Sequence, residues 1–242
     1  MGVLRLHGKI AAVTGAGRGL GRAIASALGA EGADVALSYR QNRSGAEAAA
    51  EAMRGLGRRT LALPADARVP GEIAGFVGEA AERMGGLDIL VNNAGVFRRT
   101  PLESLSEQDL DEAFDVNVKA AVLASRAAAP HMRKRGGGVI VNVASLGGIR
   151  AWPKHLPYCA SKAALIMATR CLALALAPEI RVNALAPGIL EPPRADAGLV
   201  RKVPLGRFGS HAEAVEAILF LVTGAAYTTG EVIRVDGGRS LA

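Results

Sequence analysis

The stretch KIAAVTGAGRGLG, residues 9–21, decides the fold. It begins as a short apolar run of the kind that forms a buried strand, and it continues as TGAGRGLG (14–21), where a helix is about to start. Gly15 permits a tight turn, Gly19 lets a ligand approach the backbone, and Gly21 lets the following helix pack close to a sheet. Backbone N–H groups at such a turn can bind a diphosphate, because the start of a helix favours negative charge.

Outward from this turn, short aliphatic runs alternate with alanine-rich helical patterns along the whole chain. Several of the strand candidates are almost continuously apolar, which is typical of a parallel sheet covered by helices on both faces. Right-handed crossovers then give one doubly wound, Rossmann-like α/β sheet of about seven strands, in a single domain over residues 1–242. The predicted strands are 9–15, 34–40, 60–66, 87–95, 138–145, 180–188 and 231–238, and the predicted helices are 19–31, 44–56, 70–84, 103–134, 157–177 and 211–222.

The composition is that of a globular protein, with 50% hydrophobic and 21% charged residues. The net charge of +7 is dispersed and aromatic residues make up only 4%, so we expect no nucleic-acid partner. No uncharged apolar run reaches the ~18 residues of a membrane span, and no signal-peptide core is present, so we expect a cytoplasmic protein without a membrane partner. Cys159 and Cys171 are predicted to be small buried residues, and we expect no metal because no histidine stands at ligand spacing.

A second motif, YCASK at residues 158–162, puts a tyrosine and a lysine one helical turn apart. Most such pairs are a half-buried ring beside a solvated ammonium, so the pair by itself indicates no chemistry. The alternative is an acid–base device, in which the cation of Lys162 lowers the pKa of Tyr158 from ~10 toward neutrality. Ser145, at the end of a predicted strand, could then hydrogen-bond a substrate carbonyl oxygen and polarise it.

TGAGRGLG (14–21), NNAG (92–95) and YCASK (158–162), in this order, resemble the TGxxxGxG, NNAG and YxxxK signatures of the short-chain dehydrogenase/reductase family. The resemblance extends through RVNALAPG (181–188) to GEVIRVDGG (230–238) and covers nearly the whole chain. It implies a nicotinamide cofactor, hydride transfer and a catalytic set formed by Asn117, Ser145, Tyr158 and Lys162. In that set Asn117 would anchor a water that relays protons to Lys162, and Lys162 would also hold the nicotinamide ribose.

The resemblance also implies which residues contact the cofactor. Asp66 would bind the adenine amino group, and Asn92 and Ala94 would flank the adenosine. Pro187 and Gly188 would lie near the nicotinamide amide. With Tyr158 and Lys162, the expected cofactor contacts are Gly15, Arg18, Gly19, Leu20, Gly21, Tyr39, Arg40, Asp66, Asn92, Ala94, Gly95, Pro187, Gly188 and Leu190.

The end of the second predicted strand indicates which nicotinamide cofactor is used. A carboxylate at this place receives the ribose 2′-hydroxyl of NAD and repels a 2′-phosphate. This chain has Ser38, Tyr39 and Arg40 there instead, and Arg18 lies in the glycine turn. The competing interpretation, two ordinary surface arginines, fits Arg40 alone better than it fits the pair. We therefore expect NADP(H) in preference to NAD(H).

Two departures from the family pattern concern the substrate side. Pro192 stands where the pattern PGxIxT has a threonine, so the hydroxyl that contacts the nicotinamide carboxamide is missing. Segment 189–210, whose Pro, Gly and charged residues predict a loop or lid, is shorter than in typical 3-oxoacyl-carrier-protein reductases. Either the pocket is more open, or specificity moves to 146–156, where Leu146 and Trp152 are the expected substrate contacts. Trp152 would stack on a planar substrate or, equally well, pack behind a loop.

The end of the chain, TTGEVIRVDGG (228–238), is most similar to the 3-oxoacyl-carrier-protein reductase branch. That similarity implies a small-molecule carbonyl substrate linked to a carrier protein or to CoA. APGILEPP (186–193) and Trp152 favour an alternative, a pteridine-reductase-like or general carbonyl reductase. An NADP-binding regulatory protein without turnover is the alternative from another class, and the complete catalytic set argues against it. Family members are usually tetramers, so a homotetramer, or a dimer, is expected.

Overall fold

The chain forms one wholly parallel sheet in the order β3-β2-β1-β4-β5-β6-β7. This computed structural model describes residues 4–191 and 197–242. The chain starts in the middle of the sheet, runs outward to β3, and returns to place β4 beside β1, as in a doubly wound fold. The strands are β1 (Ile10–Val13), β2 (Asp34–Tyr39), β3 (Thr60–Pro64), β4 (Ile89–Asn92), β5 (Gly138–Val143), β6 (Ile180–Pro187) and β7 (Val232–Val235). The predicted fold class is confirmed.

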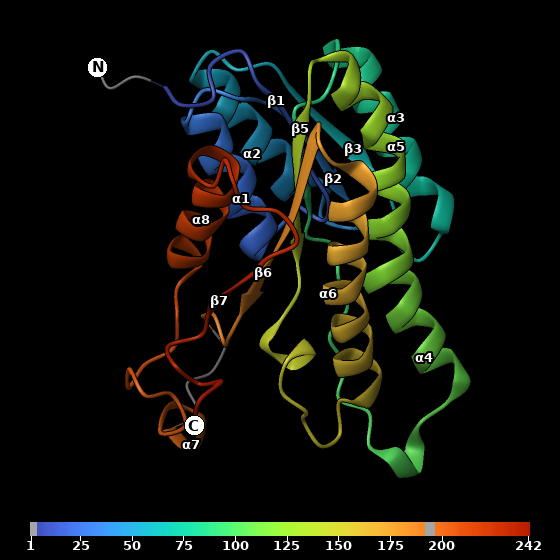
Figure 1. Cartoon of the computed structure of the whole chain (residues 1–242), viewed down its shortest axis with the longest axis vertical. Coiled ribbons are helices and arrows are strands. Elements are labelled where there is room, and N and C mark those ends of the chain that lie inside the picture. Colours follow the sequence, from blue (N-terminus) through green and yellow to red (C-terminus); the bar gives the residue numbers. More distant parts are fainter. Residues whose placement is uncertain (1–3, 192–196) are drawn as a thin grey trace.

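Helices cover both faces of the sheet. They are α1 (Gly19–Ala30), α2 (Arg43–Gly55), α3 (Pro70–Met84), α4 (Glu107–Phe114), α5 (Ala120–Lys134), α6 (Leu156–Leu176), α7 (Ala197–Val200) and α8 (His211–Leu219), with short turns of other helix types at Leu102–Ser104, Asp115–Lys119, Leu146–Gly148 and Phe220–Gly224. α1, α2 and α8 pack on one face, and α3, α5 and α6 pack on the other (Figure 1).

The central strand β1 shows why the sequences of the strands are almost continuously apolar. Ala11 and Val13 point into the core beneath α1, whereas Ile10 and Ala12 point into the core beneath α3. Successive side chains of a strand alternate between the two faces, and here both faces are covered by helices. Every position of the strand must therefore be apolar, and all of them are buried.

The predicted helix 103–134 is divided in the structure. α4 begins at Glu107, because Ser106 caps it and accepts a hydrogen bond from the Asp109 N–H while Asp109 bonds back to Ser106. A π-helical turn, Asp115–Lys119, then separates α4 from α5. Such turns occur mostly as single insertions in α-helices and are frequent at functional sites. Asn117 lies inside this turn.

α6 is long and apolar enough to cross a membrane by length and composition alone, with a mean hydropathy of 1.5. In this fold it is a covering helix that packs against β6. It buries Ser161, Lys162 and Thr169 on the side that faces the sheet. These polar side chains are hydrogen-bonded inside the protein, as the interior of a globular domain requires.

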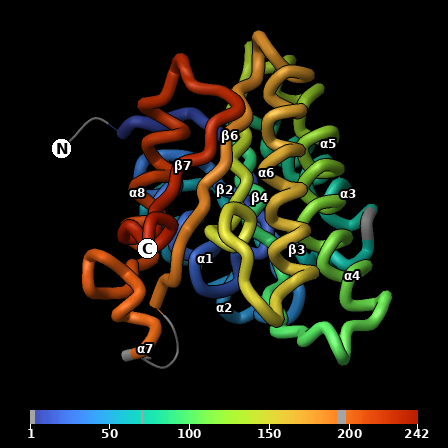
Figure 2. The backbone as a smooth tube through the Cα atoms, turned by 60° about the horizontal axis from the view of Figure 1, so that its bottom comes forward, coloured from blue at the N-terminus to red at the C-terminus, as the bar shows by residue number. Residues whose placement is uncertain are grey.

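Because all strands are parallel, their carboxyl ends share one edge of the sheet, and the loops that follow them meet there. Figure 2 turns this edge toward the viewer and shows the start of α1 beside the segment between β5 and α6. Segment 189–210 leaves the same edge after β6, and its ends are joined where Glu191 N–H donates to the Gly209 carbonyl at 3.0 Å. Pro192 lies outside the described residues.

Candidate active site

The glycine turn after β1 opens into the main cleft of the protein, which has a volume of about 510 Å³. Gly15 and Gly19 have φ values of +65° and +54°, which residues with a side chain rarely adopt. A Cβ at Gly19 would meet nothing within 4 Å, so the backbone at the start of α1 is open toward the cleft. A Cβ at Gly21 would instead clash with the Asn93 amide, because α1 packs tightly against the end of β4.

Most of the predicted cofactor residues line this cleft. A dinucleotide fits it, because the free N–H groups of the α1 N-terminus lie at its centre and polar ends of β2 and β3 lie at one side. The predicted residues that line it are Gly15, Arg18, Gly19, Leu20, Gly21, Tyr39, Arg40, Asp66, Ala94 and Gly95.

Ser145, Tyr158 and Lys162 come together beyond the far end of the cleft. Ser145 follows β5, and its buried hydroxyl accepts a hydrogen bond from the Gly147 N–H at 3.0 Å. The Tyr158 hydroxyl on α6 interacts with the Ser145 side chain, and this interaction lowers the pKa of Tyr158. One turn further along α6, Lys162 is only 4% exposed, and its Nζ donates to the Val143 carbonyl of β5 at 2.7 Å. A Cβ at Gly95 would lie 3.5 Å from Lys162 Nζ, so the lysine reaches the NNAG segment that lines the cleft.

Asn117 joins the α4–α5 turn to its surroundings. Its Oδ1 accepts from the Val96 N–H at 2.9 Å, and its Nδ2 donates to the Val96 carbonyl at 3.2 Å. The same Nδ2 donates to the Ser161 hydroxyl at 2.9 Å, on the residue beside Lys162. Asn117 therefore ties α6 to the loop after β4, which borders both the cleft and Tyr158.

The electrostatics of Tyr158 differ from the sequence-based prediction. Burial raises the pKa of Tyr158 above its usual value of 10.0, and the hydrogen bond to Ser145 only partly opposes this effect. The predicted net lowering of the Tyr158 pKa is therefore not found in this structure, and the effect of the Lys162 cation on the phenolate stays a prediction. Burial also lowers the pKa of Lys162 from 10.5 to about 8, because the interior disfavours its charge.

Comparison with known proteins places the chain in a family. A family model described as enoyl-(acyl carrier protein) reductase matches residues 15–240. The 3-oxoacyl-[acyl-carrier-protein] reductase FabG of Staphylococcus aureus is 36% identical over 239 residues, which is 95% of this chain and 97% of that protein. The chain belongs to the short-chain dehydrogenase/reductase family. It is therefore an oxidoreductase by family.

Two solved structures are similar to this chain along nearly their whole length. A short-chain dehydrogenase from Burkholderia cenocepacia in complex with NADP is 38% identical with a TM-score of 0.92, covering 97% of this chain and 99% of that one. The blue fluorescent protein from a metagenomic library in complex with NADPH is 34% identical with a TM-score of 0.94, covering 98% and 99%. Both of these structures hold a phosphorylated nicotinamide cofactor.

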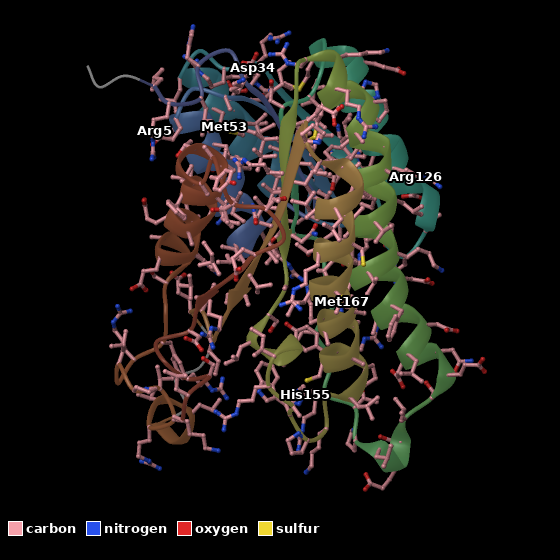
Figure 3. The ribbon with its side chains drawn as sticks, viewed as in Figure 1. Arg5, Asp34, Met53, Arg126, His155 and Met167 are labelled. Atoms are coloured by element: carbon pink, nitrogen blue, oxygen red, sulfur yellow. The ribbon has the colours of Figure 1, made fainter. Side chains whose placement is uncertain are left out.

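Aromatic rings that the sequence analysis mostly missed surround Tyr158 in this short-chain dehydrogenase/reductase. Phe97, on the loop after β4, meets the Tyr158 ring edge-on at 4.7 Å between centroids. Trp152 stacks on Tyr158 at 6.1 Å with an interplanar angle of 18°. His155 stacks on Phe97 at 5.0 Å, and in Figure 3 it lies at the carboxyl edge, at the start of α6. The guanidinium of Arg239 lies 5.5 Å from the Trp152 centroid.

These rings connect the cleft to Tyr158. Phe97 lines the cleft and is 60% exposed, and it also contacts Tyr158. The backbone of the two loops is joined where the Thr100 N–H donates to the Lys154 carbonyl at 2.7 Å. Phe97, Trp152 and His155 thus form an aromatic wall beside Tyr158, and Phe97 is the member of this wall that lines the cleft.

Some predicted site residues lie elsewhere. Leu146 is fully buried, so it packs in the core beneath its loop and offers no surface to a substrate. Asn92 is also buried, and its amide donates to Asn142 Oδ1 at 2.8 Å and to Ser125 Oγ at 3.2 Å. Asn93 lines the cleft in its place. Side chains alternate along β4, and that period of two could have indicated which asparagine faces the ligand.

The residues after β6 line the edge of the sheet. Pro187 pairs with Val235 of β7, and Gly188 N–H donates to the Val235 carbonyl at 2.9 Å. Leu190 packs partly against the core and is bridged to Gly209.

The prediction that both cysteines are buried was wrong, because Cys171 is exposed and Cys159 is half-buried on α6.

Proposed function

We propose that this chain is an NADPH-dependent reductase that converts a carbonyl group to a secondary alcohol, with Tyr158 as the acid–base residue. The observation that carries this proposal is the meeting of Tyr158 and Lys162 on α6 with Ser145 after β5, where Lys162 is buried and donates to the Val143 carbonyl, beyond a cleft lined by the glycine turn. The sequence identity of this chain to FabG and to structures solved with NADP or NADPH also supports the proposal.

The cleft has a place for each part of the cofactor. The α1 N-terminus would hold the diphosphate, and Arg18 and Arg40 would hold a 2′-phosphate, since β2 ends in Tyr39 without a carboxylate. We propose NADP(H) in preference to NAD(H) on this charge pattern. When bound, the cofactor supplies the hydride.

The residues of this chain would supply the proton and orient the carbonyl. The pKa of Tyr158 is raised by burial, so its hydroxyl is protonated at neutral pH and can donate to the developing alkoxide. Ser145 would donate a hydrogen bond to the same oxygen. Lys162, with a pKa of about 8, is mainly an ammonium at pH 7 and would stabilise the phenolate that is left behind. Asn117 would hold the loop after β4 against α6 and anchor the water that returns a proton.

The first substrate class we propose is a β-keto thioester linked to CoA or a carrier protein, because of the similarity to FabG. A planar pteridine-like compound is the second candidate, and the aromatic wall beside Tyr158 supports it. NADPH oxidation with acetoacetyl-CoA and with dihydrobiopterin tests the two classes side by side. The Tyr158→Phe variant is the control, and it should lose activity with the preferred substrate but still bind NADPH.

Two outcomes would overturn this assignment. Unchanged turnover in Tyr158→Phe would contradict the proposed role of Tyr158 as the acid–base residue. NADPH binding without turnover of any carbonyl compound would instead favour a regulatory NADP-binding protein. Inactivity with acetoacetyl-CoA, together with activity on another carbonyl compound, would exclude β-keto thioesters as substrates. The assignment as a reductase would then still hold.

We also propose a homotetramer, or a dimer, in the cytoplasm. α6 exposes Met167 (54% exposed) and Leu174 (85% exposed), and Figure 3 shows Met167 on this outer helix. Met167 and Leu174 are seven residues apart and therefore share one face of α6, and a contiguous exposed apolar patch marks an interaction site. Light scattering should give the mass of an oligomer, and Leu174→Glu should shift it toward the monomer of 24.9 kDa.

A further inference from the structure

The adenosine end of the cleft carries a carboxylate beside the arginine that would hold a 2′-phosphate. Tyr39 of β2 pairs with Pro64 of β3, and the Ala65 N–H donates to the Tyr39 carbonyl at 2.8 Å. The next residues, Arg40 and Asp66, therefore leave neighbouring strands at the same edge, and both line the cleft. A free carboxylate here would repel a phosphate for the same reason that a carboxylate at the end of β2 does.

The Asp66 carboxylate is engaged by Arg68. Nε of Arg68 donates to Oδ1 at 3.1 Å and to Oδ2 at 3.0 Å, and Nη2 donates to Oδ2 at 2.5 Å. The Arg68 N–H also donates to Oδ1 at 3.0 Å. These bonds lower the pKa of Asp66, and the positive charge of Arg40 adds to the effect. Asp66 is thus ionised at neutral pH, and its charge is matched at contact distance.

Neutralisation of Asp66 reduces the negative charge at the adenosine end, where the Glu72 carboxylate also accepts a hydrogen bond from the Asp66 N–H at 2.7 Å. Arg68 also lines the cleft, so Asp66 and Arg68 together contribute no net charge to it. Arg18 and Arg40 then remain as the cations that act on a 2′-phosphate. Without Arg68, the carboxylate would offset one of these cations, and a doubly charged phosphate would feel that loss more than a neutral hydroxyl.

We propose that Arg68 is a positioning residue for cofactor specificity: it neutralises Asp66, so that a carboxylate able to bind adenine can stand beside a 2′-phosphate. Arg68 thereby favours NADPH over NADH. The inference rests on the proposed NADP(H) preference, and it adds a residue from the loop between β3 and α3 to the arginines of the glycine turn and of β2.

The test is calorimetric titration of the protein with NADPH and with NADH, which reads binding without turnover. Arg68→Gln should weaken NADPH binding about tenfold and NADH binding less than about threefold, since the change acts mainly on the phosphate. The double variant Asp66→Asn/Arg68→Gln should recover most of the wild-type ratio of the two Kd values, because no carboxylate is left to neutralise.

Arg59→Gln is the matched control. Arg59 is bound to Asp34 in the same manner, with its N–H at 2.8 Å and its Nε at 2.7 Å, at the amino end of β2. Figure 3 shows Asp34 at the opposite end of the molecule from His155 and the carboxyl edge. This variant should leave both Kd values unchanged.

Each of the other possible results of the titrations contradicts one specific part of the proposal. If Arg68→Gln weakens the binding of NADPH and of NADH equally, Arg68 only supports the conformation of its loop. A selective loss that the double variant does not recover would mean that Arg68 binds the phosphate directly and that neutralisation is not its role. Equal wild-type Kd values for NADPH and NADH would overturn the proposed cofactor preference itself, whereas a large wild-type ratio that Arg68→Gln leaves unchanged overturns only the inference.

Discussion

The two ends of the cleft use charge in opposite ways. At the adenosine end, Arg40 and Arg68 are solvent-accessible and Asp66 is paired, so charge acts through the number and sign of exposed groups. At the catalytic end, Lys162 is the buried cation, and desolvation sets its pKa and that of Tyr158. Exposed charges are screened by salt and easily compensated, whereas buried ones are not. Variants at the two ends should therefore separate binding from chemistry.

Tyr158→Phe should have the largest effect. It removes the proton donor from the catalytic end and leaves the adenosine end intact, so kcat should fall about 10³-fold, within the range for a lost acid–base group. The Kd of NADPH should change less than about twofold, since the hydroxyl lies beyond the diphosphate and adenosine contacts. Stopped-flow turnover and calorimetric titration measure the two values, and a parallel loss of both would mean that the ends are not separate.

Lys162→Met should reduce kcat about 100-fold by removing the cation that stabilises the phenolate. It should also stabilise the fold at pH 7. The drop in the pKa of Lys162 from 10.5 to about 8 corresponds to ~3 kcal/mol of folding free energy, which is the cost of keeping the buried ammonium charged. The hydrogen bond from its Nζ to the Val143 carbonyl offsets part of this cost. We expect a net gain of about 1–3 kcal/mol in the free energy of unfolding.

The sign of this effect can be checked with pH. The folded-state pKa of Lys162 is depressed, so the penalty is complete below pH 8, and it disappears between pH 8 and 10.5 as the unfolded chain loses its extra proton. The stability advantage of Lys162→Met in chemical denaturation should shrink over that range. An advantage that is constant from pH 7 to pH 10 would show that the burial of charge is not its cause.

Replacement of the aromatic wall should have a smaller effect that is confined to the substrate. Phe97→Leu and Trp152→Leu keep apolar bulk but remove ring contacts with Tyr158, so the substrate KM should rise about fivefold to tenfold. In Trp152→Leu the Kd of NADPH should stay constant, because Trp152, unlike Phe97, does not line the cleft. A change in NADPH binding in Trp152→Leu would contradict the division between the two ends.

Salt should have the smallest effect and should act on one end only. Raising the ionic strength from 0.05 to 0.5 M shortens the Debye length to about a third, which should weaken NADPH binding about threefold to tenfold through Arg18 and Arg40. The value of kcat at saturating NADPH should change less than about twofold, because Lys162 is buried and Tyr158 is half-buried. A kcat that falls as steeply as the affinity would place screened charge at the catalytic end.

Sequence reasoning was accurate where a motif also fixes backbone geometry. The turn at 14–21 required glycine at defined positions, and the continuous apolar strands required helices on both faces, so the order of elements and many of the residues that line the cleft were predictable. It was less accurate for side chains whose environment comes from distant segments. Nothing in the loop after β4 indicated that Phe97 would meet a tyrosine on α6, and nothing near Asp66 indicated that Arg68 would hold its carboxylate.

The sequence by itself thus determined the fold, the family and the residues that meet at the catalytic end, because glycine geometry, strand periodicity and helical spacing are local properties. Only the tertiary structure decided how those residues titrate and what surrounds them. Spacing alone predicted that Lys162 lowers the pKa of Tyr158, but the pKa depends on how far each group is removed from water. That burial is created by β5, α6 and the loops from distant parts of the chain, which no local pattern contains.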